Sequence, residues 1–206
     1  MIYEMIRFRT DVLGVPALSR LLKARFSDTL NPVAGSLTGV WRTEIGELGT
    51  LLLLRSFSCQ DALLKARHRT LESRTPFGIK MNDVLIEAEA FEGFPFLKPP
   101  EFGECGGLYE IRTYSLKAGG LEPTLKAWQS ALKPAQAYTR HLITNMFALD
   151  GASRICHIWA FDSFEQRNIL RQQHYADGLW PPKGGSEQII HAQSCLCLPE
   201  TFSPLR

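Results

Sequence analysis

The pattern of apolar and polar residues is the same in the two halves of the chain. Residues 2–22 begin with β-branched and aromatic side chains and continue, after a glycine, with leucines at helical spacing. Residues 108–128 repeat that order, and Tyr3 corresponds to Tyr109 at an offset of 106 residues. Later segments correspond at offsets of 105 and 104 residues. We infer that one unit of about a hundred residues occurs twice.

The first half predicts strands and helices in the order βαββαβ. Alternating or continuous apolar runs mark the strands, and leucines three and four positions apart mark the helices. Four antiparallel strands with two helices on one face form a ferredoxin-like unit. The predicted segments are a strand at 2–10, a helix closed by Asn31-Pro32, a hairpin across 39–57, a helix through 63–67 and a strand at 84–91.

The second half repeats these segments after a stretch that is dense in proline and glycine. We predict a first repeat at residues 1–97, a linker at 98–105 and a second repeat at 106–206. Capping boxes mark the second helix of each repeat: Ser163 with Gln166, and approximately Ser58 with Asp61. The apolar face of each open sheet has to be covered. We therefore expect an α+β fold in which the two sheets pack against one another within one chain, as a pseudo-dimer.

Three stretches of the sequence resemble the NIPSNAP family. They are residues 109–114 (YEIRTY), residues 43–48 (TEIGEL) and residues 157–163 (HIWAFDS), which the family usually writes as His-Leu-Trp-Arg-Tyr-Asp-Ser. The resemblance covers both halves, although Ala160 replaces the usual arginine. It implies the dimeric α/β-barrel fold, in which two ferredoxin-like sheets face one another and enclose a pocket. It implies no agreed catalytic mechanism.

Composition excludes several classes of partner. The 23 basic and 21 acidic residues are well mixed and leave a net charge of +2, without a basic block of the kind that binds nucleic acid. Apolar runs such as residues 51–54 are much shorter than the roughly 20 residues of a membrane span. We expect no signal peptide, because strand-like sequence with charged residues begins at once. The odd number of cysteines, five, favours reduced thiols and a cytoplasmic location.

The best candidate for a functional site lies on the second repeat. Side chains alternate along a strand, so Glu110, Arg112 and Tyr114 share one face, and His157 and Trp159 share a face of the partner strand. We expect the more apolar face to pack on the helices, which places these five residues inside the barrel as a ligand site. The alternative is that Glu110 and Arg112 pair only because buried charges need partners.

The corresponding positions of the first repeat are largely apolar. We expect Ile6, Phe8, Leu52 and Leu54 to form the opposite, greasy wall of the same pocket. Such a cavity suits a ligand with one polar end, because a few polar groups orient it while apolar walls supply affinity.

The sequence leaves the function open between two main hypotheses. We favour a non-enzymatic protein that binds a small, partly apolar ligand between its sheets or serves as an assembly module, with a homo-oligomer as a further option. The alternative is a cofactor-independent oxygenase or isomerase with His157 as the base. Haem binding through a histidine is a weaker, third option.

No metal or cofactor is expected. Cys195 and Cys197 share one strand face and could suit a soft metal, but no second pair has ligand spacing. Patterns typical of serine hydrolases, P-loop proteins and zinc proteases are absent from the sequence.

Overall fold

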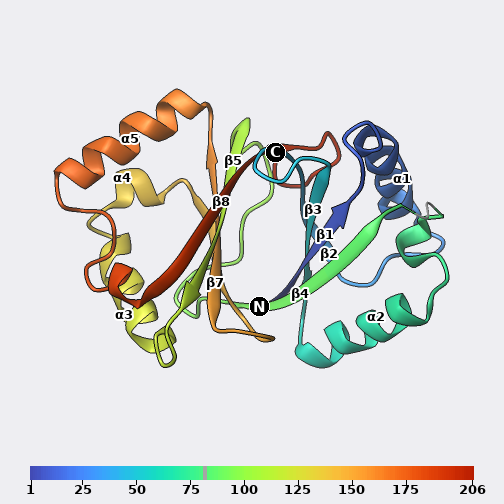
Figure 1. Ribbon diagram of the computed structural model, residues 1–206, viewed down its shortest axis with the longest axis horizontal. Coiled ribbons are helices and arrows are strands. Elements are labelled where there is room, and N and C mark those ends of the chain that lie inside the picture. The colour runs from blue at the N-terminus through green and yellow to red at the C-terminus, as the bar shows by residue number, and fades with distance from the viewer. Residues whose placement is uncertain (81–82) are drawn as a thin grey trace.

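The strands of the chain form one closed barrel with the helices outside it (Figure 1). The computed structural model describes residues 1–80 and 83–206, and its strands follow one another in the order β1-β3-β2-β8-β5-β7-β6-β4. The first repeat supplies β1 (Ile2–Arg9), α1 (Val15–Ser27), β2 (Ser36–Ile45), β3 (Thr50–Phe57), α2 (Gln60–Glu72), the 3-10 turn η1 (Pro76–Gly78) and β4 (Leu85–Gly93).

The second repeat follows the same order with one addition. It supplies β5 (Leu108–Leu116), α3 (Leu121–Leu132), the short α4 (Gln136–Thr139), β6 (Leu142–Ala148), β7 (Arg154–Phe161), α5 (Phe164–Ala176), the 3-10 turn η2 (Ser186–Gln188) and β8 (Ile189–Pro199). The predicted fold class, tandem ferredoxin-like repeats in an α+β protein, is confirmed, whereas α4 was not predicted. The repeat boundaries stay a prediction, with the proposed linker 98–105 between β4 and β5.

Hydrogen-bonded seams join the two repeats. β2 pairs with β8, with Thr43 opposite Cys197, and β4 pairs with β6, with Phe91 opposite Ala148. All neighbouring strands are antiparallel. The sheets therefore enclose a common interior, as expected, and they also pair edge to edge, so that the described strands close into a barrel.

Apolar side chains fill both the barrel and the space under the helices. The leucine run of β3 alternates between them: Leu52 and Leu54 belong to the interior core, and Leu51 and Leu53 to the core beneath α1. Helices α1 and α2 cover one side of the barrel, and α3, α4 and α5 cover the other (Figure 1). Within the described part of the chain, no helix has the length and apolar character that crossing a bilayer requires.

Local signals explain most of the element boundaries. The Gln166 amide donates to Ser163 Oγ at 3.1 Å, so the predicted cap of α5 is confirmed. The equivalent cap at Ser58 is wrong, because Cys59 occupies the cap position of α2 and makes no side-chain cap bond. In the β2–β3 turn, Gly49 has a φ of +75°, and a Cβ there would lie 2.2 Å from the Thr10 carbonyl oxygen. Only glycine fits this close approach.

Candidate functional site

The five candidate residues of the second repeat lie together, but on the helix-covered face of the sheet. The β5–β7 register places Glu110 opposite Trp159 and Arg112 opposite His157. Trp159 belongs to the core shared with the helices, and Tyr138 of α4 stacks on it with ring centroids 4.6 Å apart. The structure thus places these residues near one another, whereas their predicted position between the two sheets is wrong.

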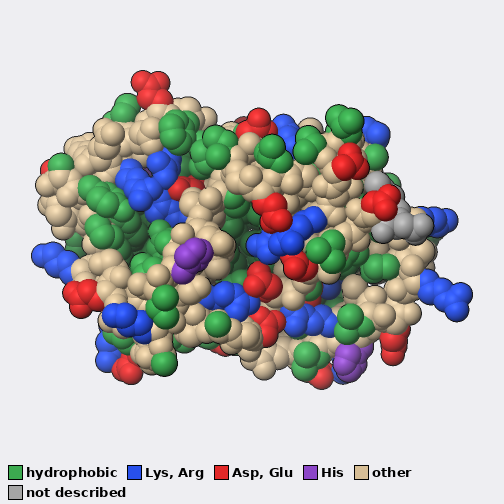
Figure 2. Space-filling view, viewed as in Figure 1, with side chains coloured by type: hydrophobic (Ala, Val, Ile, Leu, Met, Phe, Trp, Pro, Cys, Tyr) green, Lys and Arg blue, Asp and Glu red, His purple; other side chains and the backbone are tan. Residues whose placement is uncertain are grey.

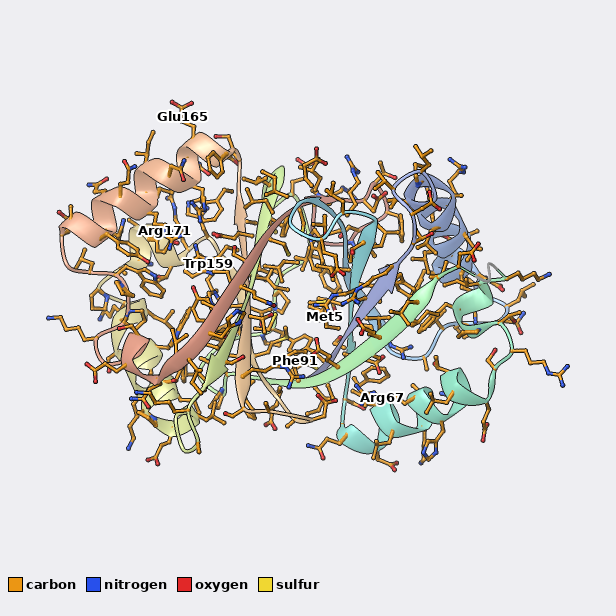
Figure 3. All side chains as sticks on the ribbon, viewed as in Figure 1. Met5, Arg67, Phe91, Trp159, Glu165 and Arg171 are labelled. Carbon is orange, nitrogen blue, oxygen red and sulfur yellow. The ribbon has the colours of Figure 1, made fainter. Side chains whose placement is uncertain are left out.

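Charges on helix α5 explain this orientation. The sequence argument assigned the apolar face of β5 to the helices, since helices usually cover the more apolar side. In the structure, Arg167 and Arg171 project from α5 toward Glu110, so its carboxylate finds its partners there. Figure 3 shows Arg171 on α5 and Trp159 on β7, on this side of the barrel. The charged face is therefore stable beneath a helix of matching charge.

The predicted greasy wall is also divided between two faces. Ile6 and Phe8 pack beneath α1, whereas Leu52 and Leu54 lie inside the barrel. The strand registers explain this error. Ile6 pairs with Leu53, and Arg112, the counterpart of Ile6 in the second repeat, pairs with His157. The counterpart of His157 is therefore Leu53 and not Leu52. The true offset between β3 and β7 is therefore 104 residues, not the 105 used above. A slip of one residue moves every side chain to the other face of a strand.

Glu110 is the most densely bonded side chain of this group. Its carboxylate accepts hydrogen bonds from Arg112 Nη2 at 2.7 Å, from Arg167 Nη2 at 2.6 Å and Nε at 3.0 Å, and from Ser194 Oγ at 2.9 Å. Burial alone would raise the pKa of Glu110, but the bond from Arg167 and the charge of Arg112 outweigh it and hold the pKa at about 2. Glu110 is therefore ionised at neutral pH. The predicted Glu110–Arg112 pair is confirmed.

His157 is held as a neutral hydrogen-bond acceptor of Trp159 rather than as a free base. Trp159 Nε1 donates to His157 Nδ1 at 2.6 Å, so the proton of the neutral ring sits on Nε2. Burial and the charge of Arg112 lower the pKa of His157 well below its usual value, which keeps the ring neutral. With one nitrogen occupied and the other protonated, His157 has no free lone pair for proton abstraction in this arrangement.

A cavity of about 340 Å³ lies inside the barrel, between the two sheets. Its apolar lining side chains are buried, whereas several charged and polar ones stand partly exposed at its opening. Figure 3 shows Met5 and Phe91 near the middle of the barrel. The lining residues are Met5, Arg7, Thr43, Gly46, Glu47, Thr50, Leu52, Glu89, Phe91, Ile111, Thr113, Cys156, Gln193, Ser194 and Cys195.

The charged groups at this cavity are unequally paired. Glu47 lies 2.9 Å from Arg9, and Glu89 lies 2.7 Å from Arg154. Arg7 has only a contact of 3.6 Å to Glu87, which makes a shorter contact of 2.9 Å with Arg9. Of the charged residues that line the cavity, Arg7 is thus the least tightly paired and the most available to a ligand.

Two thiols lie side by side in the barrel wall. Cys195 lines the cavity, and its Sγ lies 3.6 Å from Cys197 Sγ. The hydrogen bond from Cys197 lowers the pKa of Cys195. All five cysteines are unpaired in the structure, and no group of three or more potential ligands among residues 1–80 and 83–206 is placed to hold a metal ion.

Sequence reasoning missed residues at both places. Arg167 and Arg171 are four positions apart after the Ser163 cap, so the helical period could have placed both on one face, toward a buried acid. Arg7 alternates with Ile6 along β1, which could have marked it as facing away from the helices. Nothing in the sequence around Ser194 predicts its contact with Glu110.

Comparison with known proteins gives one family and one recurring fold. The model of the NIPSNAP family matches residues 109–204. Protein Atu4242 of Agrobacterium tumefaciens, a NIPSNAP family protein of unknown function, is 31% identical over 48% of this chain and 99% of its own, with a TM-score of 0.44. A single relative of this kind therefore has about the length of one repeat. The comparison with curated proteins found no match.

Two structures of similar extent share the whole architecture. A candidate monooxygenase from Lactobacillus acidophilus NCFM is 10% identical, with a TM-score of 0.69 over 97% of this chain and 94% of its own. Another from Fusobacterium nucleatum is 9% identical, with a TM-score of 0.62 over 96% of this chain and 91% of its own. At these identities the likeness concerns the fold alone.

Proposed function

The chain belongs to the NIPSNAP family, and from this premise we propose that it binds a small, mainly apolar molecule with one polar end inside its barrel. The observation that carries the proposal is the cavity of about 340 Å³ between the sheets. Ligand sites in proteins are typically concave, mainly apolar and about 300 to 1,000 Å³ in volume. The proposed place is the one expected from the sequence, between the two sheets, although of the expected residues only Leu52 is among those that line it.

The lining favours a ligand whose two ends differ. Met5, Leu52, Phe91 and Ile111 offer buried apolar surface, which would supply most of the affinity. Arg7 stands partly exposed with only a loose ion pair, so it would receive the polar end. An anionic or hydrogen-bonding head group is the chemistry that a guanidinium recognises.

Binding fits the observations better than catalysis. The buried His157 is neutral and accepts a hydrogen bond from Trp159, and it lies on the helix side of the sheet, away from the barrel cavity. The resemblance to candidate monooxygenases concerns the fold. A cytoplasmic location and a homo-oligomer stay predictions beside this proposal.

Calorimetric titration of the whole protein with octanoate and with 1-octanol tests the proposal. We expect saturable binding of octanoate in the wild type and at least tenfold weaker binding in Thr113→Trp, because an indole at this half-buried lining position fills the cavity. Thr29→Trp, at an exposed loop position, is the matched control and should bind as the wild type does. Arg7→Met should weaken octanoate binding more than octanol binding.

Equal binding by Thr113→Trp and the wild type would contradict the cavity as the site. Circular dichroism of each variant first shows that its fold is retained.

A further inference from the structure

The helix-covered face of the second repeat holds more positive than negative charge. Three arginines, Arg112, Arg167 and Arg171, approach the single carboxylate of Glu110. Among the ion pairs that the described residues make, Glu110 is their only acidic partner. We call Glu110 and these three arginines the arginine cluster. Three positive charges meet one negative charge in it, so two positive charges are left without a counter-charge.

The first repeat shows the balanced version of the same arrangement. Glu4, the counterpart of Glu110, lies 2.5 Å from Arg55 and 2.7 Å from Arg67. Arg67 also reaches Asp150 at 3.2 Å. Asp150 and Glu89 both pair with Arg154, so three arginines meet three carboxylates in this network. The surplus charge is thus a property of the second repeat and not of the fold. Burying unpaired charge is costly, so the surplus calls for an anionic partner.

Buried donors without acceptors surround the cluster. Arg112 Nε, His157 Nε2 and Tyr138 Oη are all buried and have no hydrogen-bond partner among the described residues. Arg112 and His157 are 3% and 1% exposed, and Tyr138 is fully buried. Each of the three can donate, since Nδ1 of His157 is already an acceptor and burial raises the pKa of Tyr138 to about 12. A buried donor without an acceptor destabilises a fold by about 1 to 3 kcal/mol. An oxyanion can accept hydrogen bonds from a guanidinium, an imidazole and a phenol, so it would satisfy all three donors.

Buried aromatic side chains and partly exposed polar ones border the arginine cluster. Trp128 packs on His157 with centroids 5.1 Å apart, and Trp180 packs on Trp159 at 5.6 Å. The Arg171 side chain is 31% exposed, and Ser194 of β8 is exposed beside Glu110. Figure 2 shows basic side chains at the surface between α5 and β8. A ligand could therefore reach the arginines between these two elements.

We propose that the arginine cluster is a second binding site, which takes an oxyanion carried by a small aromatic acid. The two oxygens of a carboxylate match the paired N–H groups of a guanidinium, and an aromatic ring would pack on the neighbouring tryptophans. A phosphate group offers the same oxygen chemistry, so the test separates the two sources.

Tryptophan fluorescence of the whole protein, titrated at low salt, tests this site directly. Trp128, Trp159 and Trp180 are the reporters, and sodium benzoate, inorganic phosphate and benzyl alcohol are the probes. We expect saturation by benzoate, weaker saturation by phosphate and none by the neutral alcohol. Arg171→Gln, a partly exposed helix position, should weaken benzoate binding about tenfold, as loss of one charge-assisted contact predicts. Lys126→Gln removes an equal charge from exposed α3 and should leave binding unchanged.

Two controls keep this site separate from the barrel cavity. Thr113→Trp, which fills that cavity, should bind benzoate as the wild type does. Stronger saturation by phosphate than by benzoate would overturn the aromatic acid as the carrier. Absence of saturation with either anion, or equal affinity in Arg171→Gln and the wild type, would overturn the site itself.

Discussion

At Glu110, the cost of burying a carboxylate is offset by hydrogen bonds from Arg112, Arg167 and Ser194. These bonds hold only while the group is ionised. Since the pKa of Glu110 is about 2 in the folded protein, below its usual 4.5, the ionised form stabilises the fold above about pH 4.5. This stabilisation is lost as the pH falls toward 2.

We expect this group to contribute a measurable acid sensitivity. Protonation of Glu110 in the unfolded chain, where its pKa is about 4.5, should lower the free energy of unfolding by about 2 kcal/mol between pH 5 and pH 3. Urea unfolding at both pH values measures it, and Glu110→Gln should lose this part of the pH dependence. The exposed Glu122→Gln is the control and should keep it. A Glu110→Gln protein with the pH dependence of the wild type would contradict the role of this carboxylate.

The cysteines should differ in reactivity according to burial. Cys156 and Cys197 are 3% and 0% exposed, and burial raises the pKa of Cys156 to about 12. Thiol titration of denatured, unreduced protein should return all five thiols. In native protein these two should react slowest, and Cys59, which is exposed, should react fast. Fewer than five thiols after denaturation would indicate a disulfide or another modification.

At the scale of elements, the β2–β3 turn and helix α5 position residues of the barrel cavity and of the arginine cluster. The turn brings Gly46 and Glu47 to the barrel cavity, and α5 brings Arg167 and Arg171 to Glu110. The turn can do so because Gly49 has no Cβ to clash with the Thr10 carbonyl oxygen. The Thr10 amide in turn donates a hydrogen bond to the Gly49 carbonyl at 2.9 Å.

Alanine substitution should reveal how tightly this turn is held. Gly49→Ala should lower the free energy of unfolding by more than Gly119→Ala, since both glycines have positive φ but a Cβ at Gly119 meets nothing within 4 Å. The left-handed backbone alone costs about 1 kcal/mol, and the clash at Gly49 adds to it. Thermal and urea unfolding of the two variants measure the difference. Equal losses would show that the turn relaxes around the new methyl group.

At the scale of the molecule, the seams β2–β8 and β4–β6 make the two repeats parts of one barrel. Neither sheet can lose its structure without exposing the strand edges and interior side chains of the other. The interior core accordingly mixes residues of both repeats, such as Met5 and Leu52 with Ile111 and Ile158.

We therefore expect a single cooperative unfolding transition. Calorimetry should give one peak whose calorimetric enthalpy equals the van't Hoff enthalpy. Fluorescence, which reports mainly on the second repeat through Trp128, Trp159 and Trp180, should give the same midpoint as circular dichroism. Two separate midpoints would show that the repeats unfold independently.

Local patterns in the sequence determined the repeat, the order of the elements and the grouping of Glu110 with Arg112, His157 and Trp159. These features depend on side-chain alternation and helical spacing, which short stretches of chain specify. The leucine run of β3 and the Ser163 cap belong to the same class, because each depends on residues that are near in sequence.

Tertiary structure alone decided which face of each sheet points into the barrel. That choice depends on Arg167 and Arg171, 57 and 61 residues beyond Glu110, and on a register between β3 and β7 that a one-residue slip reverses. It also decided the lining of the cavity, to which strands of both repeats contribute one or a few side chains each. Long-range charge pairing and barrel closure act between segments that no local pattern connects, so only the folded chain brings them together.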